Sequence, residues 1–278
     1  MSNKPSLFTR HTLLILFMIF VTLYSSVLVM FTREGHPKTV MTGIDGNAPH
    51  FEVHLLNVDL LRDLATFTFL PDMASSGLAV NGRLNSDILV EIDTGTSVLT
   101  HTFKKGEVPA GWSVNIPVQY GDAMDYPFDK HGGEFFFKVK REGSSSPLAR
   151  VDLDKVLHGF SASATVDAAV DGTQVALTYE FSRSPSVIFL AVIALSSLSM
   201  VVLSALSVAK HVALHGRKVE FGMLTWIAAL LFVIPAVRNG LPGSPPFGSL
   251  VDIALFFWLH ILTVGALLTV VYKWIKQP

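Results

Sequence analysis

The chain consists of four long apolar runs and one long polar stretch. The apolar runs occupy residues 12–31, 187–208, 221–237 and 250–272. A helix needs about 20 predominantly apolar residues to cross the hydrocarbon layer of a membrane, so each run predicts a transmembrane helix. The polar stretch separates the first run from the second. The pattern therefore predicts one transmembrane helix, a domain exposed to water, and then three further transmembrane helices.

The polar stretch begins with a segment that has no periodicity. Residues 32–49 mix charge, glycine and proline, and we expect a linker there. From residue 50 onward, apolar and polar residues alternate in short segments rich in Thr, Val and aromatic residues, as in strands with one buried face. We expect about eight strands, at 50–55, 65–70, 88–93, 97–103, 112–118, 134–139, 161–169 and 174–181.

These short strands predict the fold class of the polar domain. Asp171-Gly172, between the last two segments, is a hairpin signal. No convincing amphipathic helix lies among the strands. Residues 50–185 therefore predict an all-β antiparallel sandwich, with a barrel as the alternative.

The first apolar run also has features of a secretory signal. Lys4 and Arg10 precede it, as basic residues precede the apolar core of a signal peptide. The run is longer than that core usually is, and no small-residue cleavage site follows it. We expect an uncleaved signal anchor, and a cleaved signal is the alternative.

Basic residues gather on one side of the predicted spans. They lie in the N-terminus 1–11, the loop 209–220 and the tail 273–278, as Lys4, Arg10, Lys210, Arg217, Lys218, Lys273 and Lys276. The positive-inside rule places these three segments in the cytoplasm. Residues 32–186 and the loop 238–249 are then extracytoplasmic, and we expect a multi-pass protein of the cytoplasmic membrane.

Composition limits the classes of partner that the polar domain can bind and the compartment in which it lies. Asp and Glu outnumber Lys and Arg within residues 33–185, so the polar domain is acidic. Nucleic acids and anionic lipids bind basic surfaces, and we exclude nucleic acid as a partner. The chain has no cysteine and no Asn-x-Ser/Thr site. A domain of about 150 residues can bury a sufficient core without disulfides, and both absences fit a bacterial envelope protein.

The most distinctive local string is YPFD at residues 126–129. Pro127 cannot lie in a central strand, so we expect a turn or a sheet edge, with Tyr126 and Phe128 buried nearby. Oxygen and imidazole groups around this turn form a weaker metal hypothesis; they belong to Asp122, Asp125, Asp129 and His131. We favour a structural turn whose Asp side chains bond to nearby backbone.

A second group of candidate ligands lies in the first strand. His50, Glu52 and His54 alternate and share one face of that strand. Strand residues two apart are about 7 Å apart, which is too far for three of them to bind one ion easily. We favour an ordinary polar face over a zinc site.

Three residues in or beside the spans are interaction candidates. His260 lies within the last span, where an ionisable residue is a functional candidate. We favour a packing role, with a hydrogen bond to a neighbouring helix. Arg238 is a basic residue on the extracytoplasmic side, so we expect it to have a partner, and Asp252 is the candidate. We expect this pair and the loop 238–249 to dock beneath the β-domain.

Enzyme signatures are lacking. The chain has no HExxH, no phosphate-binding glycine loop, no GxSxG and no paired cysteines. We predict no catalytic residue, no cofactor and no metal, and we expect that the protein is not an enzyme. A Ser–His–Asp site scattered along the sequence is the alternative, because a triad is defined in space and leaves no such motif.

Two segments resemble a known family. YPFDKH at 126–131 and RNGLPGSPPFG at 238–248, with one span before a β-rich domain and three after it, resemble bacterial membrane proteins known only as a domain of unknown function. The resemblance covers residues 10–275. It implies an integral membrane protein of bacterial type, and it brings no activity and no site.

The YPFD turn is also similar to a turn of the pentameric ligand-gated channels. In that family an aromatic-Pro-Phe-Asp turn lies at the base of a β-sandwich and contacts the membrane helices. This chain departs from the family because it has a span before the sandwich, three spans after it instead of four, and no flanking cysteines. The 221–237 span also has no stripe of small polar residues to line a pore. The resemblance implies only that residues 126–129 lie near the bilayer.

The sequence thus predicts a non-enzymatic membrane protein. Its expected partners are the lipid bilayer and either an envelope protein or further copies of itself. We expect its β-domain to bind a partner or ligand, or to organise an envelope complex. A subunit of a small channel or transporter is the first alternative, and a metal-dependent envelope enzyme is the second.

Overall fold

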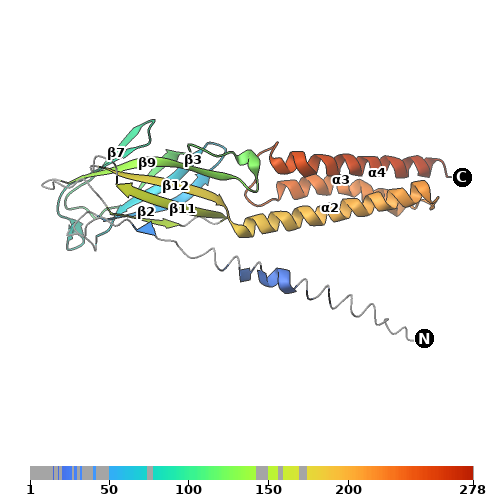
Figure 1. The fold of residues 1–278 in the computed structure, drawn as a ribbon, viewed down its shortest axis with the longest axis horizontal. Helices are drawn as coiled ribbons and strands as arrows, with labels where there is room; N and C mark the ends of the chain where they lie inside the picture. The colour runs from blue at the N-terminus through green and yellow to red at the C-terminus, as the bar shows by residue number, and fades with distance from the viewer. Residues whose placement is uncertain are drawn as a thin grey trace.

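The structure is a computed structural model in which a β-domain is followed by three long helices (Figure 1). It describes residues 40–41, 50–73, 78–141, 150–155, 159–168 and 174–277, and the helical positions 15, 18, 21–26, 28–29 and 32. Most of the expected span 12–31 and the Asp171-Gly172 turn lie outside the described residues. The β-domain and the helices lie end to end along the long axis of the molecule.

The first sheet has the strand order β1-β10-β2-β3-β8. These strands are Val40–Met41, Arg150–Lys155, His50–Asp59, Leu64–Pro71 and Trp112–Pro117. β10 pairs with β2 in parallel, whereas the other pairs are antiparallel. The expectation of a wholly antiparallel fold is therefore wrong at this one pair. The two strands are distant in sequence, so they can pair in parallel through a long connection, which a hairpin cannot provide.

The second sheet has the order β11-β12-β9-β6-β7, and all its pairs are antiparallel. Its strands are Phe160–Ala168, Val175–Arg183, Lys130–Arg141, Ile88–Asp93 and Val98–Phe103. A small ladder pairs β4 (Ala79–Val80) with β5 (Arg83–Leu84). A short 3-10 turn, η1 (Ala123–Asp125), precedes β9.

The two sheets share one aromatic core. The ring of Phe137 in the second sheet lies 5.3 Å from those of both Phe51 and Phe69 in the first. Phe67 contacts Phe135 in the same way, at 5.4 Å. All these rings are buried, because alternate residues of each strand face the other sheet. This packing is that of a two-layered sandwich.

The three helices follow the last strand directly. α2 (Pro185–Leu214) begins after Ser184, whose hydroxyl caps the helix by accepting from the N–H of Val187. α3 spans Phe221–Asn239, and the π-helical turn η2 (Asp252–Phe256) leads into α4 (Phe257–Ile275). All three helical segments are long and apolar enough to cross a membrane. Three of the four expected spans thus correspond to candidate membrane helices among the described residues.

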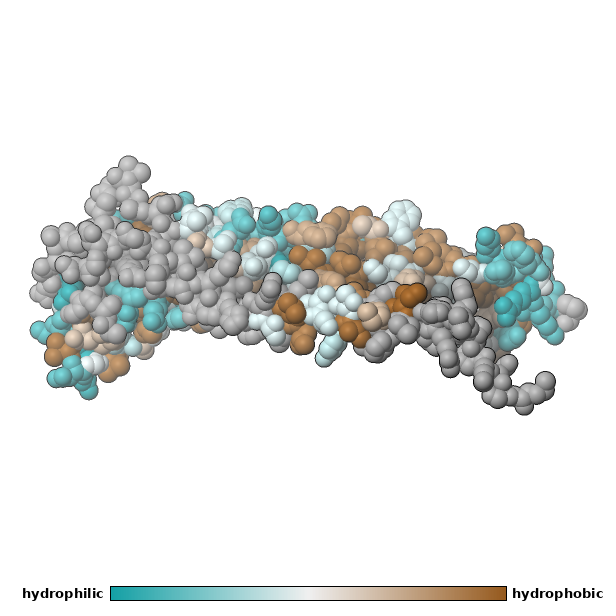
Figure 2. All heavy atoms as spheres, turned by 60° about the horizontal axis from the view of Figure 1, so that its bottom comes forward, coloured by the Kyte–Doolittle hydropathy of each residue, from teal (hydrophilic) through white to brown (hydrophobic). Residues whose placement is uncertain are grey.

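Small and branched side chains let the helices pack closely. Val202 and Ala205 of α2 are fully buried, as are Ile227 of α3 and Val270 of α4. Serines elsewhere on α2 bond to carbonyls of their own helix, for example Ser204 to Met200. Figure 2 shows a brown apolar band over the helices between the β-domain and a hydrophilic end. That end includes the exposed residues Lys210, Arg217, Lys218 and Lys276.

Several boundaries differ from those expected. The described residues form twelve strands rather than about eight, and β1 lies inside the expected linker 32–49. α2 continues to Leu214 and so includes the first part of the expected 209–220 loop. Its last turns include the polar residues Lys210 and His211. The end of the apolar run therefore did not predict the end of the helix.

Candidate functional site at the junction of the sheets and the helices

The YPFD turn contacts the helical part of the molecule from the β-domain side. Asp122 caps η1 by accepting from the N–H of Met124 at 2.8 Å, and the Tyr126–Pro127 peptide that follows is cis. Tyr126 is fully buried and packs with Ala191 of α2 and Leu241 of the α3–α4 loop. Its hydroxyl donates to the carbonyl of Pro242 at 2.9 Å. Phe128 lies on the outside of the turn and is 62% exposed, so the expectation that it is buried is wrong.

Behind this turn lies a buried ion pair. Nε of Arg183, the last residue of β12, donates to both carboxylate oxygens of Asp129 at 3.1 and 3.0 Å. Nε2 of His131 lies 3.0 Å from Oδ2 of the same carboxylate, and the His131 ring stacks on Phe181. Asp129, His131 and Arg183 are all almost completely buried. A buried charge needs such a partner, because removing it from water is unfavourable.

The surroundings shift the pKa of two groups in this cluster. Burial by itself raises the pKa of Asp129, but the hydrogen bonds from His131 and Arg183 outweigh it, so the pKa lies below the ordinary value of 3.8. Burial also raises the pKa of Tyr126 to about 12. At neutral pH, Asp129 is therefore ionised and Tyr126 keeps its proton, as the observed hydrogen bonds require.

The guanidinium of Arg183 lies between the β-domain and the α3–α4 loop. Its central carbon is 4.7 Å from the centroid of the Phe160 ring and 5.2 Å from that of Tyr126. Gly243 of the loop lies against Nη1, where a Cβ atom would overlap it. Gly243 also has a φ of +79°, which favours glycine. The loop can therefore approach Arg183 only because this position carries no side chain.

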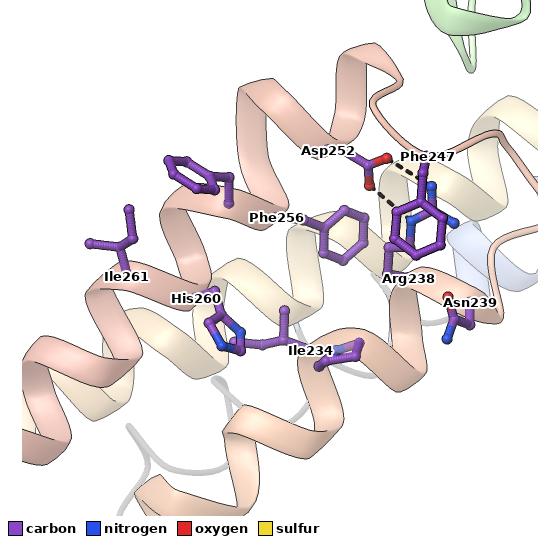
Figure 3. Close-up of a pocket in the computed structure, with 10 residues that line it drawn as sticks. Ile234, Arg238, Asn239, Phe247, Asp252, Phe256, His260 and Ile261 are labelled. Carbon is purple, nitrogen blue, oxygen red and sulfur yellow. Dashed lines mark hydrogen bonds and ion pairs between the residues drawn. The ribbon is translucent and has the colours of Figure 1, made fainter.

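A second ion pair closes the α3–α4 loop. Nε and Nη2 of Arg238 donate to Asp252 at 2.9 and 2.7 Å (Figure 3). Nη2 also donates to the carbonyl of Pro246. The N–H of Gly248 donates to Asp252, and the Phe247 ring covers the guanidinium at 4.0 Å. The pair thus holds the two ends of the loop together. The β-domain is contacted by other parts of that loop, at Pro242 and Gly243.

His260 lines a pocket of about 340 Å³ between α3 and α4. Figure 3 shows it turned toward Ile234, with Phe256 and the Arg238–Asp252 pair farther along the pocket. The residue is exposed. Among the described residues it has no hydrogen-bond partner, so the expected bond to a neighbouring helix is not present there.

The candidate metal ligands do not converge. Asp122 caps η1, whereas Asp129 and His131 are held in the buried cluster with Arg183. Nδ1 of His50 contacts Asp72 at 2.7 Å, and Nε2 of His54 lies 3.7 Å from Glu52. Within the described part of the chain, no three His, Asp or Glu side chains gather closely enough to hold an ion.

Arg183 is the site residue that sequence reasoning missed. The sequence predicted no role for this residue. Arg183 lies next to a span on the expected extracytoplasmic side, where basic residues are uncommon. The same signal that singled out Arg238 was therefore present at Arg183.

Comparisons with known families divide the chain at this junction. Residues 42–179 match the family model described as a domain of unknown function, DUF4436. Residues 183–277 match a second model with the same description, DUF8686. Neither of the two describes a channel. A comparison with curated proteins finds no match. The chain is thus similar to two domains of unknown function, joined where β12 runs into α2.

Proposed function

We propose that this is an integral membrane protein of the bacterial cell envelope that binds a partner or ligand through its β-domain, or organises an envelope complex. The role is non-enzymatic. The observation that carries the proposal is the rigid junction, in which Arg183 bonds to Asp129 and Tyr126 bonds to Pro242. A β-domain fixed in this way presents its far loops at a constant height above the bilayer, which suits recognition of another envelope component.

The distribution of charge supports an extracytoplasmic β-domain. Lys210, Arg217, Lys218 and Lys276 lie at the end of the helices away from the β-domain, and all are exposed. Short segments rich in Lys and Arg stay in the cytoplasm. Arg238, at the opposite end, is neutralised by Asp252. The β-domain and the α3–α4 loop then lie together on the outer side.

The packing of α2, α3 and α4 does not favour the channel alternative. Their shared interface is apolar and includes Val202, Ala205, Ile227 and Val270. A polar path would therefore have to form between several copies of the chain. Ion flux is the measurement that separates this alternative from a binding role.

Photocrosslinking in native membranes tests the proposal. A photoreactive amino acid is placed at Val108, which is 66% exposed in the loop before β8. That loop lies at the end of β8 that is far from the helices. The other end, at Pro117, pairs with Leu64, which follows the β2–β3 turn beside the α3–α4 loop. A matched control carries the probe at Phe232, which is 79% exposed on α3.

We expect the Val108 probe to capture a discrete envelope protein and the Phe232 probe to capture none. No captured protein at Val108, combined with ion flux through vesicles that contain the purified protein, would replace the binding role with transport.

A further inference from the structure

A pocket of about 330 Å³ lies between the β-domain and the α3–α4 loop. The β2–β3 turn forms one wall, including Asp59 and Leu61, and Ser244 and Pro246 of the loop form another. Arg183 and Phe160 form a third part of the lining. The pocket is separate from the apolar one beside His260, and its walls carry opposite charges.

Arg183 brings unused hydrogen-bond donors to this pocket. Its side chain is only 3% exposed, and Nε is engaged by Asp129. Nη1 and Nη2 have no hydrogen-bond partner among the described residues, although they carry four of the five N–H groups of the guanidinium. Arg183 lines the pocket, so these donors can bind an acceptor that enters it. A phosphate group matches the planar fork of donors that a guanidinium offers.

Asp59 supplies the opposite charge. One of its carboxylate oxygens, Oδ1, accepts from the N–H groups of Leu61 and Arg62 at 3.1 and 3.2 Å. The other, Oδ2, has only a loose contact with the exposed Arg62 side chain at 3.7 Å. This second oxygen can accept a hydrogen bond from an ammonium group. The pocket thus offers a site for an anion at Arg183 and a site for a cation at Asp59.

When the three helices are placed across a membrane, as proposed above, the pocket falls at the depth of the lipid headgroups. α2 begins at Pro185, so Arg183 marks the end of the membrane helices that faces the β-domain. The headgroup layer covers roughly the first 5 to 7 Å beyond the hydrocarbon core. Leu61, Phe128 and Phe247 surround the junction and are 77%, 62% and 80% exposed. Exposed apolar side chains at this level are covered when they enter the bilayer surface.

We infer that this pocket binds the headgroup of a zwitterionic aminophospholipid, phosphatidylethanolamine, from the leaflet that faces the β-domain. Its phosphate accepts from Nη1 and Nη2 of Arg183, and its ammonium donates to Asp59. An anionic headgroup would bring no ammonium group to Asp59. This inference rests on the placement of the helices in a membrane and is independent of what the far loops bind.

Native mass spectrometry of the purified full chain tests the inference. The protein is mixed in detergent with phosphatidylethanolamine, phosphatidylcholine or phosphatidylglycerol that carry the same acyl chains. We expect preferential retention of phosphatidylethanolamine, because choline has no N–H to donate and glycerol has no cation. Asp59→Asn keeps the oxygen that caps the β2–β3 turn and should lower this retention about tenfold, which corresponds to about 1.4 kcal/mol.

Two further variants make the result specific. Asp122→Asn is the matched control, since Asp122 caps a turn in the same way outside the pocket, and its retention should equal that of the wild type. Arg183→Lys keeps a cation beside Asp129 but loses the fork, and should weaken binding of all three lipids. Equal retention of the three lipids by the wild type, or unchanged retention in Asp59→Asn, would overturn the inference. Equal thermal stabilisation by inorganic phosphate alone would also overturn it, in favour of a free anion.

Discussion

Nε of Arg183 lies within 3.1 Å of both carboxylate oxygens of Asp129, and this pair joins the last strand to the YPFD turn. Both residues are buried, and the same turn contacts the α3–α4 loop through Tyr126. The pair therefore lies where the β-domain, the start of α2 and the loop meet. Loss of either charge should loosen all three.

Removing one charge of this pair should destabilise the protein strongly. Asp129→Asn leaves the Arg183 charge buried without a counter-ion, which costs about 3–5 kcal/mol in comparable pairs. The double variant Asp129→Leu/Arg183→Met removes both charges and should lose less than Asp129→Asn alone. Thermal unfolding midpoints in detergent measure this, with Asp122→Asn as the control. A double variant no more stable than the single variant would contradict the interpretation.

The same carboxylate predicts a loss of stability in acid. The pKa of Asp129 is below 3.8 in the folded protein, so the folded state binds its proton less readily than the unfolded chain. Its contribution is present at neutral pH and is lost as the pH falls below 3.8 through the lower folded pKa. The thermal unfolding midpoints of the wild type and Asp129→Asn should differ strongly at pH 7, and the difference should become small in acid. A difference in midpoint that does not change with pH would contradict a contribution from the ionised Asp129 carboxylate.

Tyr126 predicts the opposite behaviour in alkali. Its pKa rises from 10.0 to about 12, so the folded protein holds the phenolic proton more tightly than the unfolded chain. This contribution is present below pH 10 and is lost as the pH rises toward the folded pKa. Tyr126→Phe lacks the titrating group and the bond to Pro242, so it should be about 0.5–1.5 kcal/mol less stable at neutral pH. An alkaline titration of both proteins should bring their midpoints together.

The Arg238–Asp252 pair predicts a partial rescue. Arg238→Glu places two acids together and should sharply reduce the yield of folded protein, measured by size-exclusion chromatography of a fluorescent fusion. Asp252→Arg in the same chain restores an opposite pair. Recovery should be incomplete, because the swapped pair lacks the bonds to the Pro246 carbonyl and the Gly248 N–H. No recovery at all would show that the charge pairing itself contributes little.

Orientation is tested with single cysteines, since the chain has none of its own. A membrane-impermeant thiol reagent added to intact cells should label Val108→Cys and should not label Arg217→Cys. Both positions are exposed, so permeabilised cells provide the control in which both react. Labelling of Arg217→Cys alone in intact cells would reverse the proposed topology.

Local patterns predicted the strands and helices better than the junction between them. The 88–93 segment was predicted as a strand, and β6 has those bounds. β10 was missed because its partner β2 lies far away in sequence, so no turn signal marks the pairing. The contacts of Arg183 with Asp129 and Gly243 also join segments that are distant in the chain. Periodicity records which face of an element is buried, but it does not record which distant residue covers that face.

The short step from β12 to α2 has a mechanical consequence. Only Ser184 separates the end of the strand at Arg183 from the start of the helix at Pro185. Strand and helix therefore move together as one rigid unit, which pivots at the buried ion pair. Any force that tilts the β-domain must turn α2 within the membrane, because no hinge lies between them to absorb the motion.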